Sequence, residues 1–424
     1  MSHNRASSPQ QEAQINADEL HRLRQIATVF ASAPHRLMFF AGASSVLLSM
    51  LWWAFALADG HFGWRMMPQA PIPPIWAHAT LIQYGMFPMF FFGFLLTVFP
   101  RWLNRPSLRK SAYIPVFIGI FGGYVVAHVG LLVGAKVLLA GSVMMLAGYV
   151  AGLLALGNVL RHAGLRDRHP VSCYLALLLG SIGMTAFIGY QLGASPQWAI
   201  FAIKLGTFGL LLPVYFTVCH RMIPFFSANI APAYKLVRPA WSLPVMWLLL
   251  MTHLGLELSL HSRWLWLVDL PLAGFFLWHW ITWQPWKAMR PGILAVLHLA
   301  LLWLPIAFLL YAAQSLVEWS TGAFVLGRAP MHALGIGFFG SMLVAMVTRV
   351  TQGHSGRPMQ MGLVPWITFV ALQFVVLLRI AAEIVPNRAL WWTIAGFAWL
   401  LAFLPWVLRS LWIYVTPRAD GRPD

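Results

Sequence analysis

The chain has 424 residues, of which 60% are hydrophobic and only 9% are charged, and its mean hydropathy is +0.72. Because about a quarter of the residues of a soluble domain are charged, this composition excludes a soluble protein and indicates a polytopic integral membrane protein. The net charge of +17 invites a nucleic-acid partner, but we expect none, since membrane topology explains the basic residues better.

Taken in order, the chain begins with a polar segment, residues 1–36, that has no apolar core of the kind a signal peptide needs. We expect it to be cytoplasmic. Residues 37–415 are predicted to form a single transmembrane domain, an all-α bundle of about twelve helices, and residues 416–424 a cytoplasmic tail. Runs of about 20 apolar residues predict spans near 37–58, 76–99, 112–134, 137–160, 171–193, 197–220, 239–258, 263–283, 291–313, 329–350, 361–384 and 389–415.

The basic residues fall unevenly on the two sides of these predicted spans. Roughly three quarters of the 28 Lys and Arg lie on the N-terminal side of the membrane, among them Arg109 and Arg357, whereas only a few, such as Arg65 and Arg328, lie on the other. Positive charge is enriched in cytoplasmic loops. Both termini are therefore predicted to be cytoplasmic.

Two stretches of the chain have a similar pattern. Residues 78–106 and 331–359 each place a histidine before an apolar run rich in Gly and Met, and each ends in a basic Arg-Pro exit. The histidines are His78 and His332, both at the outer ends of their spans. Ionisable groups at membrane depth are costly and usually serve a site.

Histidines are unusually frequent, fifteen against eleven acidic residues. Topology places His128 and His253 in the same outer layer as the two above, and His298 in the inner half of span 9. For any single one, packing or hydrogen bonding is the commoner role. Together they favour a haem or copper site, because imidazole suits both metals and bundle cores host such sites.

The charged residues within spans are few. Asp269 in span 8 and Glu257 at the outer end of span 7 are candidates for proton handling or for a role around a metal. Arg379 and Glu383 stand four residues apart on one helical face, which favours a structural ion pair. Lys204 in span 6 is expected to snorkel or to pair.

Three motifs carry a resemblance to a known family. The block HALGIGFFGSMLVAMVTRVTQGHSGRPM (332–359), together with GFLLTVFPRWLNRP (93–106) and HRMIPFF (220–226), resembles the NnrS family, and Asp269 and the segment around His298 join the match. The resemblance implies a haem- and copper-containing protein of the bacterial cytoplasmic (inner) membrane, linked to nitric oxide and to resistance against nitrosative stress.

The chain departs from the family pattern at the start of span 2. Many members resemble Trp-His-x-His-Glu there, whereas this chain reads Trp76-Ala77-His78-Ala79-Thr80-Leu81. Thr80 and Leu81 stand in place of the second histidine and the glutamate, so any copper or proton chemistry of those two groups is in doubt.

The fold is also loosely analogous to the catalytic subunit of haem–copper oxidases and nitric oxide reductases. In those proteins spans 2 and 10 carry the low-spin haem ligands, and His78 and His332 fall on the matching spans. The analogy stops there, because span 7 has no His-His pair, and it is an argument from fold alone.

From the resemblance and the histidine pattern we expect a b-type haem with His78 and His332 as axial ligands, or with one of them as axial ligand and the other distal, and copper as a candidate second cofactor. Nitric oxide or a related small molecule, the lipid bilayer and a respiratory-chain electron donor are the expected partners. The residues expected around copper or a second site are His128, His253 and His298, with Asp269 and Glu257 as proton-handling or outer groups.

Two other functions remain open from the residues. Gly- and Pro-interrupted spans are typical of transporters, here for copper or a metal complex. A non-catalytic assembly factor for a respiratory oxidase or reductase is the third hypothesis. Whether the chain is an enzyme is not decided by its residues.

Overall fold

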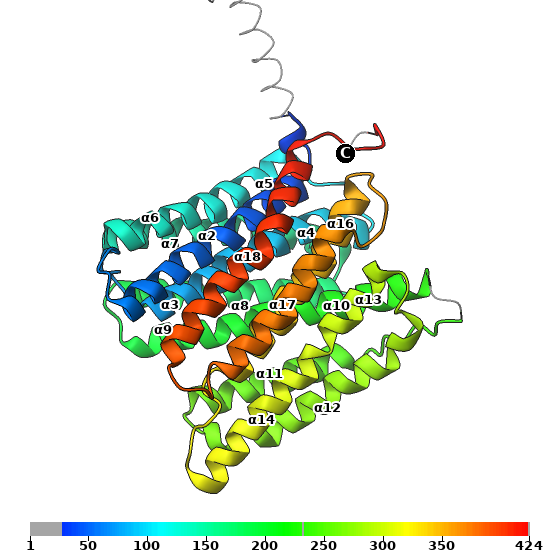
Figure 1. The fold of residues 1–424 in the computed structure, drawn as a ribbon. Coiled ribbons are helices and arrows are strands. Elements are labelled where there is room, and N and C mark those ends of the chain that lie inside the picture. Colours follow the sequence, from blue (N-terminus) through cyan, green and yellow to red (C-terminus); the bar gives the residue numbers. More distant parts are fainter. Residues whose placement is uncertain (1–27, 231–232, 423–424) are drawn as a thin grey trace, which may run out of the picture.

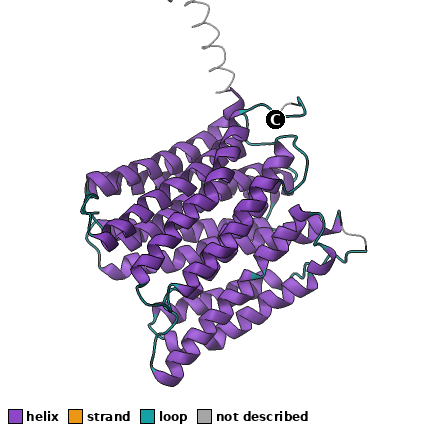
Figure 2. Cartoon of the chain, viewed as in Figure 1, coloured by secondary structure: helices purple, strands orange, loops and turns teal. Residues whose placement is uncertain are grey.

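The computed structural model describes residues 28–230 and 233–422. Most of the predicted segment 1–36 therefore lies outside the described residues. Within the described ranges the regular structure is helical and contains no strand (Figure 2). The all-α class is confirmed.

Within residues 28–230 and 233–422, ten helical segments are long and apolar enough to cross a membrane. Two shorter apolar helices, α11 (Ser242–Leu258) and α12 (Trp266–Thr282), stand where the seventh and eighth spans were predicted. At about 1.5 Å per residue a 17-residue helix covers roughly 25 Å, which is shorter than the hydrocarbon core of a bilayer. The multi-pass helical bundle is confirmed, but among the described residues length establishes ten crossings and not twelve. The ten segments are α2 (Pro34–Phe62), α3–η1–α4 (Pro74–Trp102), α5–η2–α6 (Lys110–Val133), α7 (Ala135–Ala163), α8 (Arg168–Gln191), α9–η3–α10 (Pro196–Ala228), α13–α14 (Gly292–Thr321), α15–η6–α16 (Ala329–His354), α17 (Leu363–Ala381) and α18 (Arg388–Val415).

Four of these spans contain a stretch of π-helix. They are η1 (Leu81–Met86), η2 (Ile118–Gly122), η3 (Gly206–Leu211) and η6 (Ala333–Gly340). A π-helical turn widens a helix locally and is frequent at functional sites. Apolar periodicity does not reveal such turns, and the sequence did not predict them.

One end of the bundle gathers the start of α2 and the ends of α16 and α18 (Figure 1). Arg36 donates hydrogen bonds to the carbonyls of Tyr414 and Thr416 at 3.1 and 2.8 Å, and the His35 ring lies 4.2 Å from the His354 ring between centroids. We call this end the basic face and the opposite end the far face. Charge distribution predicts that the basic face is cytoplasmic.

The hairpin of α6 (Gly123–Val133) and α7 is joined by a single residue. Gly134 has φ +140°, a left-handed conformation that favours glycine, and it falls at the predicted boundary. A Cβ on Gly130 would collide with the backbone of Leu138, and one on Gly141 with the backbone of Ala127. Small residues thus let the two backbones approach closely, as is common between membrane helices.

The outward faces of the helices are apolar. Leu154, Phe374 and Leu401 are each about 70% exposed, at 70%, 68% and 72%. Exposed aliphatic and aromatic side chains on long apolar helices are suited to lipid contact. The bilayer is therefore the environment of this bundle.

A small apolar cavity lies inside the bundle between α2, α4 (Phe87–Trp102), α10 (Leu212–Ala228) and α16 (Ser341–His354). Its volume is about 50 Å³. Tyr215 lines it, with its hydroxyl turned to the carbonyl of Phe339 at 3.1 Å and its ring stacked on the Phe339 ring at 5.0 Å. The other lining residues are Phe39, Phe90, Phe91, Phe94, Leu95, Val214, Val218, Cys219, Met342, Leu343, Met346, Val347 and Val350.

Candidate functional site

His332 ends the short helix α15 (Ala329–His332), directly before the π-helix η6. Its Nδ1 lies 2.9 Å from the carbonyl oxygen of Arg328. Because a carbonyl only accepts, Nδ1 carries the proton and Nε2 keeps its lone pair. Metal-binding histidines commonly use this arrangement, in which one nitrogen is held by a hydrogen bond and the other is free to ligate.

His78 lies near the end of α3 (Pro74–Thr80), shortly before the π-helix η1. Its ring stacks on the Trp53 indole at 4.5 Å with an interplanar angle of 17°. Its Nδ1 is buried and has no hydrogen-bond partner in the part of the chain that the structure describes. Both stretches singled out in the sequence therefore share one local design, a histidine followed by a π-helix.

The two histidines lie near one another at the far face. His78 and His332 are within electrostatic range of each other, and both are within range of Arg328 and Arg379. Arg379 forms an ion pair with Glu383, which confirms the predicted pair. Arg328 has no acidic partner within 4.0 Å among the residues of ranges 28–230 and 233–422. The structure thus brings together the two expected haem ligands and two basic side chains.

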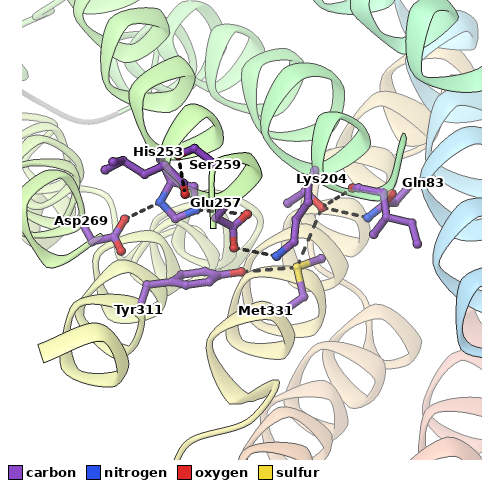
Figure 3. A network of polar contacts seen from close by, with 11 residues as sticks. Gln83, Lys204, His253, Glu257, Ser259, Asp269, Tyr311 and Met331 are labelled. Atoms are coloured by element: carbon purple, nitrogen blue, oxygen red, sulfur yellow. Dashed lines mark hydrogen bonds and ion pairs between the residues drawn. The ribbon is translucent and has the colours of Figure 1, made fainter. Parts of the chain in front are cut away.

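Polar contacts connect this region to neighbouring spans. Gln83 of η1 donates to the hydroxyl of Thr207 in η3 at 2.8 Å, and that hydroxyl lies 3.9 Å from the sulfur of Met331. The Tyr311 hydroxyl reaches the same sulfur at 3.6 Å. Since Met331 precedes His332, these contacts join the histidine region to the cluster shown in Figure 3.

The cluster is a line of four ionisable side chains of alternating type (Figure 3). Asp269 of α12 lies 2.6 Å from Nδ1 of His253 in α11, and neither side chain is exposed. On the other side of the ring, Nε2 of His253 lies 3.7 Å from Oε2 of Glu257. Lys204 then donates to Oε1 of Glu257 at 2.6 Å. Lys204 therefore pairs, one of the two roles expected for it.

This arrangement determines which atoms can hold a proton or a metal. A carboxylate only accepts, so Nδ1 of His253 donates to Asp269 and Nε2 faces Glu257. Among the described residues, Nε2 of His253, Oε2 of Glu257 and Oδ2 of Asp269 are buried without a hydrogen-bond partner. A buried polar group left unpaired is costly, so this cluster is one of the places in the bundle that hold unused hydrogen-bonding or ligating atoms.

The other two expected copper ligands lie elsewhere. Nδ1 of His128 in α6 is held by the carbonyl of Tyr124 at 2.9 Å, and Nε2 of His298 in α13 (Gly292–Leu301) lies 3.2 Å from the Ser227 hydroxyl. Over the described ranges, no three His, Cys, Asp or Glu side chains meet in a group that suits a metal ion. The structure brings His253 to Glu257 and Asp269 but does not bring His128, His253 and His298 together.

Sequence reasoning missed a third group of polar residues, at the basic face. His169 belongs to a predicted cytoplasmic loop, where a solvated or interfacial side chain is expected. In the structure it lies between Asp167 and His220, with nitrogen contacts of 3.1 and 3.0 Å. A signal was present: His169 lies just before predicted span 5 (171–193) and His220 ends predicted span 6 (197–220), so the alternating topology puts both at the same membrane surface. Topology gives only the depth of His169 and His220 in the membrane, so it could not predict that the two rings are in contact.

Two comparisons with known proteins bear on these sites. A family model described as "NnrS protein" matches residues 29–418, nearly the whole chain. No individual curated protein matches it. The match includes both histidine stretches and all four residues of the line from Asp269 to Lys204.

Proposed function

The chain belongs to the NnrS family, and on that premise we propose that it binds haem at the far face and acts in nitric oxide metabolism or in resistance to nitrosative stress. Family membership supports a role related to nitric oxide. The observation that carries the haem assignment is the pair formed by His78 and His332, from two spans, each followed by a π-helix.

The donor chemistry of this region fits a haem. Nε2 of His332 has a lone pair available for a metal, because Nδ1 of the same ring donates a hydrogen bond to the backbone carbonyl of Arg328. His78 has an unpartnered buried nitrogen. Arg328 has its side chain available to pair with a propionate, whereas Arg379 is shared with Glu383. When bound, the haem would supply nitric oxide binding, electron transfer or sensing.

Copper is the second cofactor of the proposal. Of the three histidines that the sequence suggested as its ligands, only His253 lies beside another candidate ligand in the described part of the chain. Nε2 of His253 and Oε2 of Glu257, 3.7 Å apart, would hold it, with Asp269 fixing the His253 ring from behind. This carboxylate–histidine pattern is typical of metal sites. The line of Asp269, His253, Glu257 and Lys204 can equally hold a proton at Nε2 of His253, between two carboxylates.

The apolar cavity supports a small neutral ligand. Its volume of about 50 Å³ exceeds what one water molecule needs, and apolar cavities of this kind stay dry and take up small apolar molecules. The Tyr215 hydroxyl donates to the backbone carbonyl of Phe339, so this hydroxyl is not available to bind a water molecule in the cavity. A diatomic gas entering from the bilayer would find space there.

The test is a reduced-minus-oxidised visible spectrum of the detergent-purified protein, with iron and copper content on the same sample. We expect about one haem per chain, lost in His332→Ala. His162→Ala is the matched control, because exposed His162 makes the same Nδ1 contact to the carbonyl four residues earlier, at 2.7 Å. Full haem retention in both His78→Ala and His332→Ala would overturn the ligand assignment.

A transporter for copper or a metal complex is the second candidate. The observation that favours it is the interruption of four spans by π-helix beside a buried line of charges, since transporter sites are commonly built from broken helices. A colourless, iron-free protein, even after haem supplementation, would favour this candidate.

A further inference from the structure

A hydrogen-bonded pair of imidazoles runs from the basic face into the bundle between α8 and α10. Nε2 of His169 lies 3.0 Å from Nδ1 of His220. The His169 side chain is 15% exposed, whereas His220 is only 2% exposed. The pair therefore connects a nitrogen near solvent to one that is buried.

Asp167 and Arg221 orient the outer ring. Oδ1 of Asp167 accepts hydrogen bonds from the backbone N–H and from Nδ1 of His169, at 3.0 and 3.1 Å. Arg221 donates to Oδ2 of Asp167 at 2.6 Å and lies 4.5 Å over the Trp102 ring. Nδ1 of His169 lies 3.1 Å from Oδ1 of Asp167 and 3.4 Å from the guanidinium of Arg221. Because the shorter contact is to a carboxylate, which only accepts, we assign the proton to Nδ1, and Nε2 of His169 then accepts from Nδ1–H of His220.

The inner end of the pair is a single free lone pair. Nε2 of His220 is buried without a partner among the residues described. Beyond His169, the other imidazole beside His220 is His279, whose ring lies 5.8 Å away. Both nitrogens of His279 are occupied, by the Phe275 carbonyl at 2.8 Å and the Ser242 hydroxyl at 2.9 Å. One lone pair with no second ligand suits a proton better than a metal ion.

We propose that His169 and His220 form a proton relay between the basic face and the interior of the bundle, with Asp167 and Arg221 as positioning residues. The proposal does not depend on the haem assignment. The titratable and charged groups that act on His220 are His169, His279 and Arg238, and Asp167 and Arg221 contact the His169 ring.

The relay moves one proton in each step and no electron. A proton arriving from the interior forms a bond with Nε2 of His220. The Nδ1–H bond of His220 then breaks as that proton passes to Nε2 of His169. Finally the Nδ1–H of His169 is released to water beside Asp167. After this transfer both rings carry their proton on Nε2. From that state the same steps in reverse carry a proton from water to the interior.

The charge state of Asp167 agrees with an orienting role. Burial raises the pKa of Asp167, but the hydrogen bonds from His169 and the charge of Arg221 outweigh it and hold the pKa well below its usual value. The carboxylate therefore stays ionised. It fixes the tautomer of His169 and stabilises the imidazolium that forms during transfer, as the carboxylate of a catalytic triad does.

The experiment measures exchange of imidazole N–H protons with deuterated water, using NMR of the full chain labelled with ¹⁵N-histidine and reconstituted in lipid. His220→Gln and His279→Gln identify the two signals. His279 is the internal control, since it is equally buried and also has its Nδ1–H bonded. We expect His220 to exchange at least about tenfold faster than His279.

Two variants sharpen the result. His169→Gln keeps a hydrogen-bonding side chain but cannot pass a proton through a ring, so exchange at His220 should slow to the rate of His279. His162→Gln, at an exposed histidine, should change nothing. Equal exchange rates for His220 and His279 in the unmodified protein would overturn the relay, whether or not His169→Gln folds. Unchanged exchange at His220 in folded His169→Gln would overturn it too.

Discussion

Asp269 and His253 form a fully buried pair, with Oδ1 of Asp269 and Nδ1 of His253 2.6 Å apart and neither side chain exposed. The pair joins α12 to α11, the two 17-residue helices that stand where the eighth and seventh spans were predicted. Glu257 and Lys204 extend it to α9 (Pro196–Leu205). The position of α11 is therefore set by charges as well as by apolar packing.

The first prediction concerns this pair. Asp269→Ala should reduce the free energy of unfolding by roughly 3–5 kcal/mol, because it leaves a buried imidazole without its partner. Thermal unfolding in detergent measures the change. Asp59→Ala is the control, since Asp59 makes only an exposed contact to the Met66 N–H. A similar loss in both variants would contradict the structural role of the Asp269–His253 pair.

The second prediction concerns Arg328 near His78 and His332. If the haem lies there, Arg328→Gln should lower its midpoint potential by tens of millivolts, since removal of a nearby positive charge disfavours the reduced form. A spectroelectrochemical titration measures the shift. Arg357→Gln, in the loop after α16, should leave both haem content and potential unchanged. An equal shift in both variants would place the haem elsewhere.

The third prediction concerns the orientation of the bundle. Arg65→Cys, in the loop between α2 and α3, should react with a membrane-impermeant thiol reagent only from outside the cell, and Arg109→Cys, just before α5 (Lys110–Phe117), only from the cytoplasm. Native Cys173 and Cys219 are fully buried and should give little background. The reverse labelling pattern would contradict the predicted topology.

The fourth prediction follows from the lowered pKa of Asp167. A carboxyl group with a pKa lowered in the folded state stabilises that state above its unfolded pKa, about 3.9, and the contribution is lost as pH falls toward the folded value. Unfolding temperature should therefore decline more steeply with acid below about pH 4 in the unmodified protein than in Asp167→Asn. Parallel pH profiles would show that Asp167 has no such role.

The fifth prediction concerns the contact of α6 with α7. Gly130→Leu should cost at least about 1–3 kcal/mol, because a side chain there meets the Leu138 backbone and cannot be accommodated by rotation. Gly255→Leu, where no atom lies within 4 Å of an added Cβ, is the control. Thermal unfolding compares them, and equal stability would mean that the two backbones separate easily.

Most of the fold could be predicted from the sequence, because a run of about 20 apolar residues has few alternatives to a membrane helix. Even the break at Gly134 followed from its position between two apolar runs. The four π-helices could not be predicted, since one extra residue per turn hardly changes an apolar pattern. The short lengths of α11 and α12 also became apparent only in the structure.

The sequence predicted at which depth in the membrane the candidate residues lie, but not which of them are lateral neighbours. Topology placed His78, His332 and His253 in one layer, and two of them do lie near each other. It also placed His128 there, yet that ring bonds to Tyr124 of its own helix. Which helices become neighbours depends on side-chain packing across the bundle, and a single sequence does not record that packing.

The one-residue connection at Gly134 has a consequence for how the protein is made. A one-residue linker cannot span the bilayer. Once the end of α6 has reached the far face, the start of α7 must therefore be at the far face too. The two segments must therefore enter the lipid as one folded unit, with their polar backbone groups already satisfied inside each helix. If α7 were synthesised late, α6 would wait at the insertion machinery without the helix against which it packs.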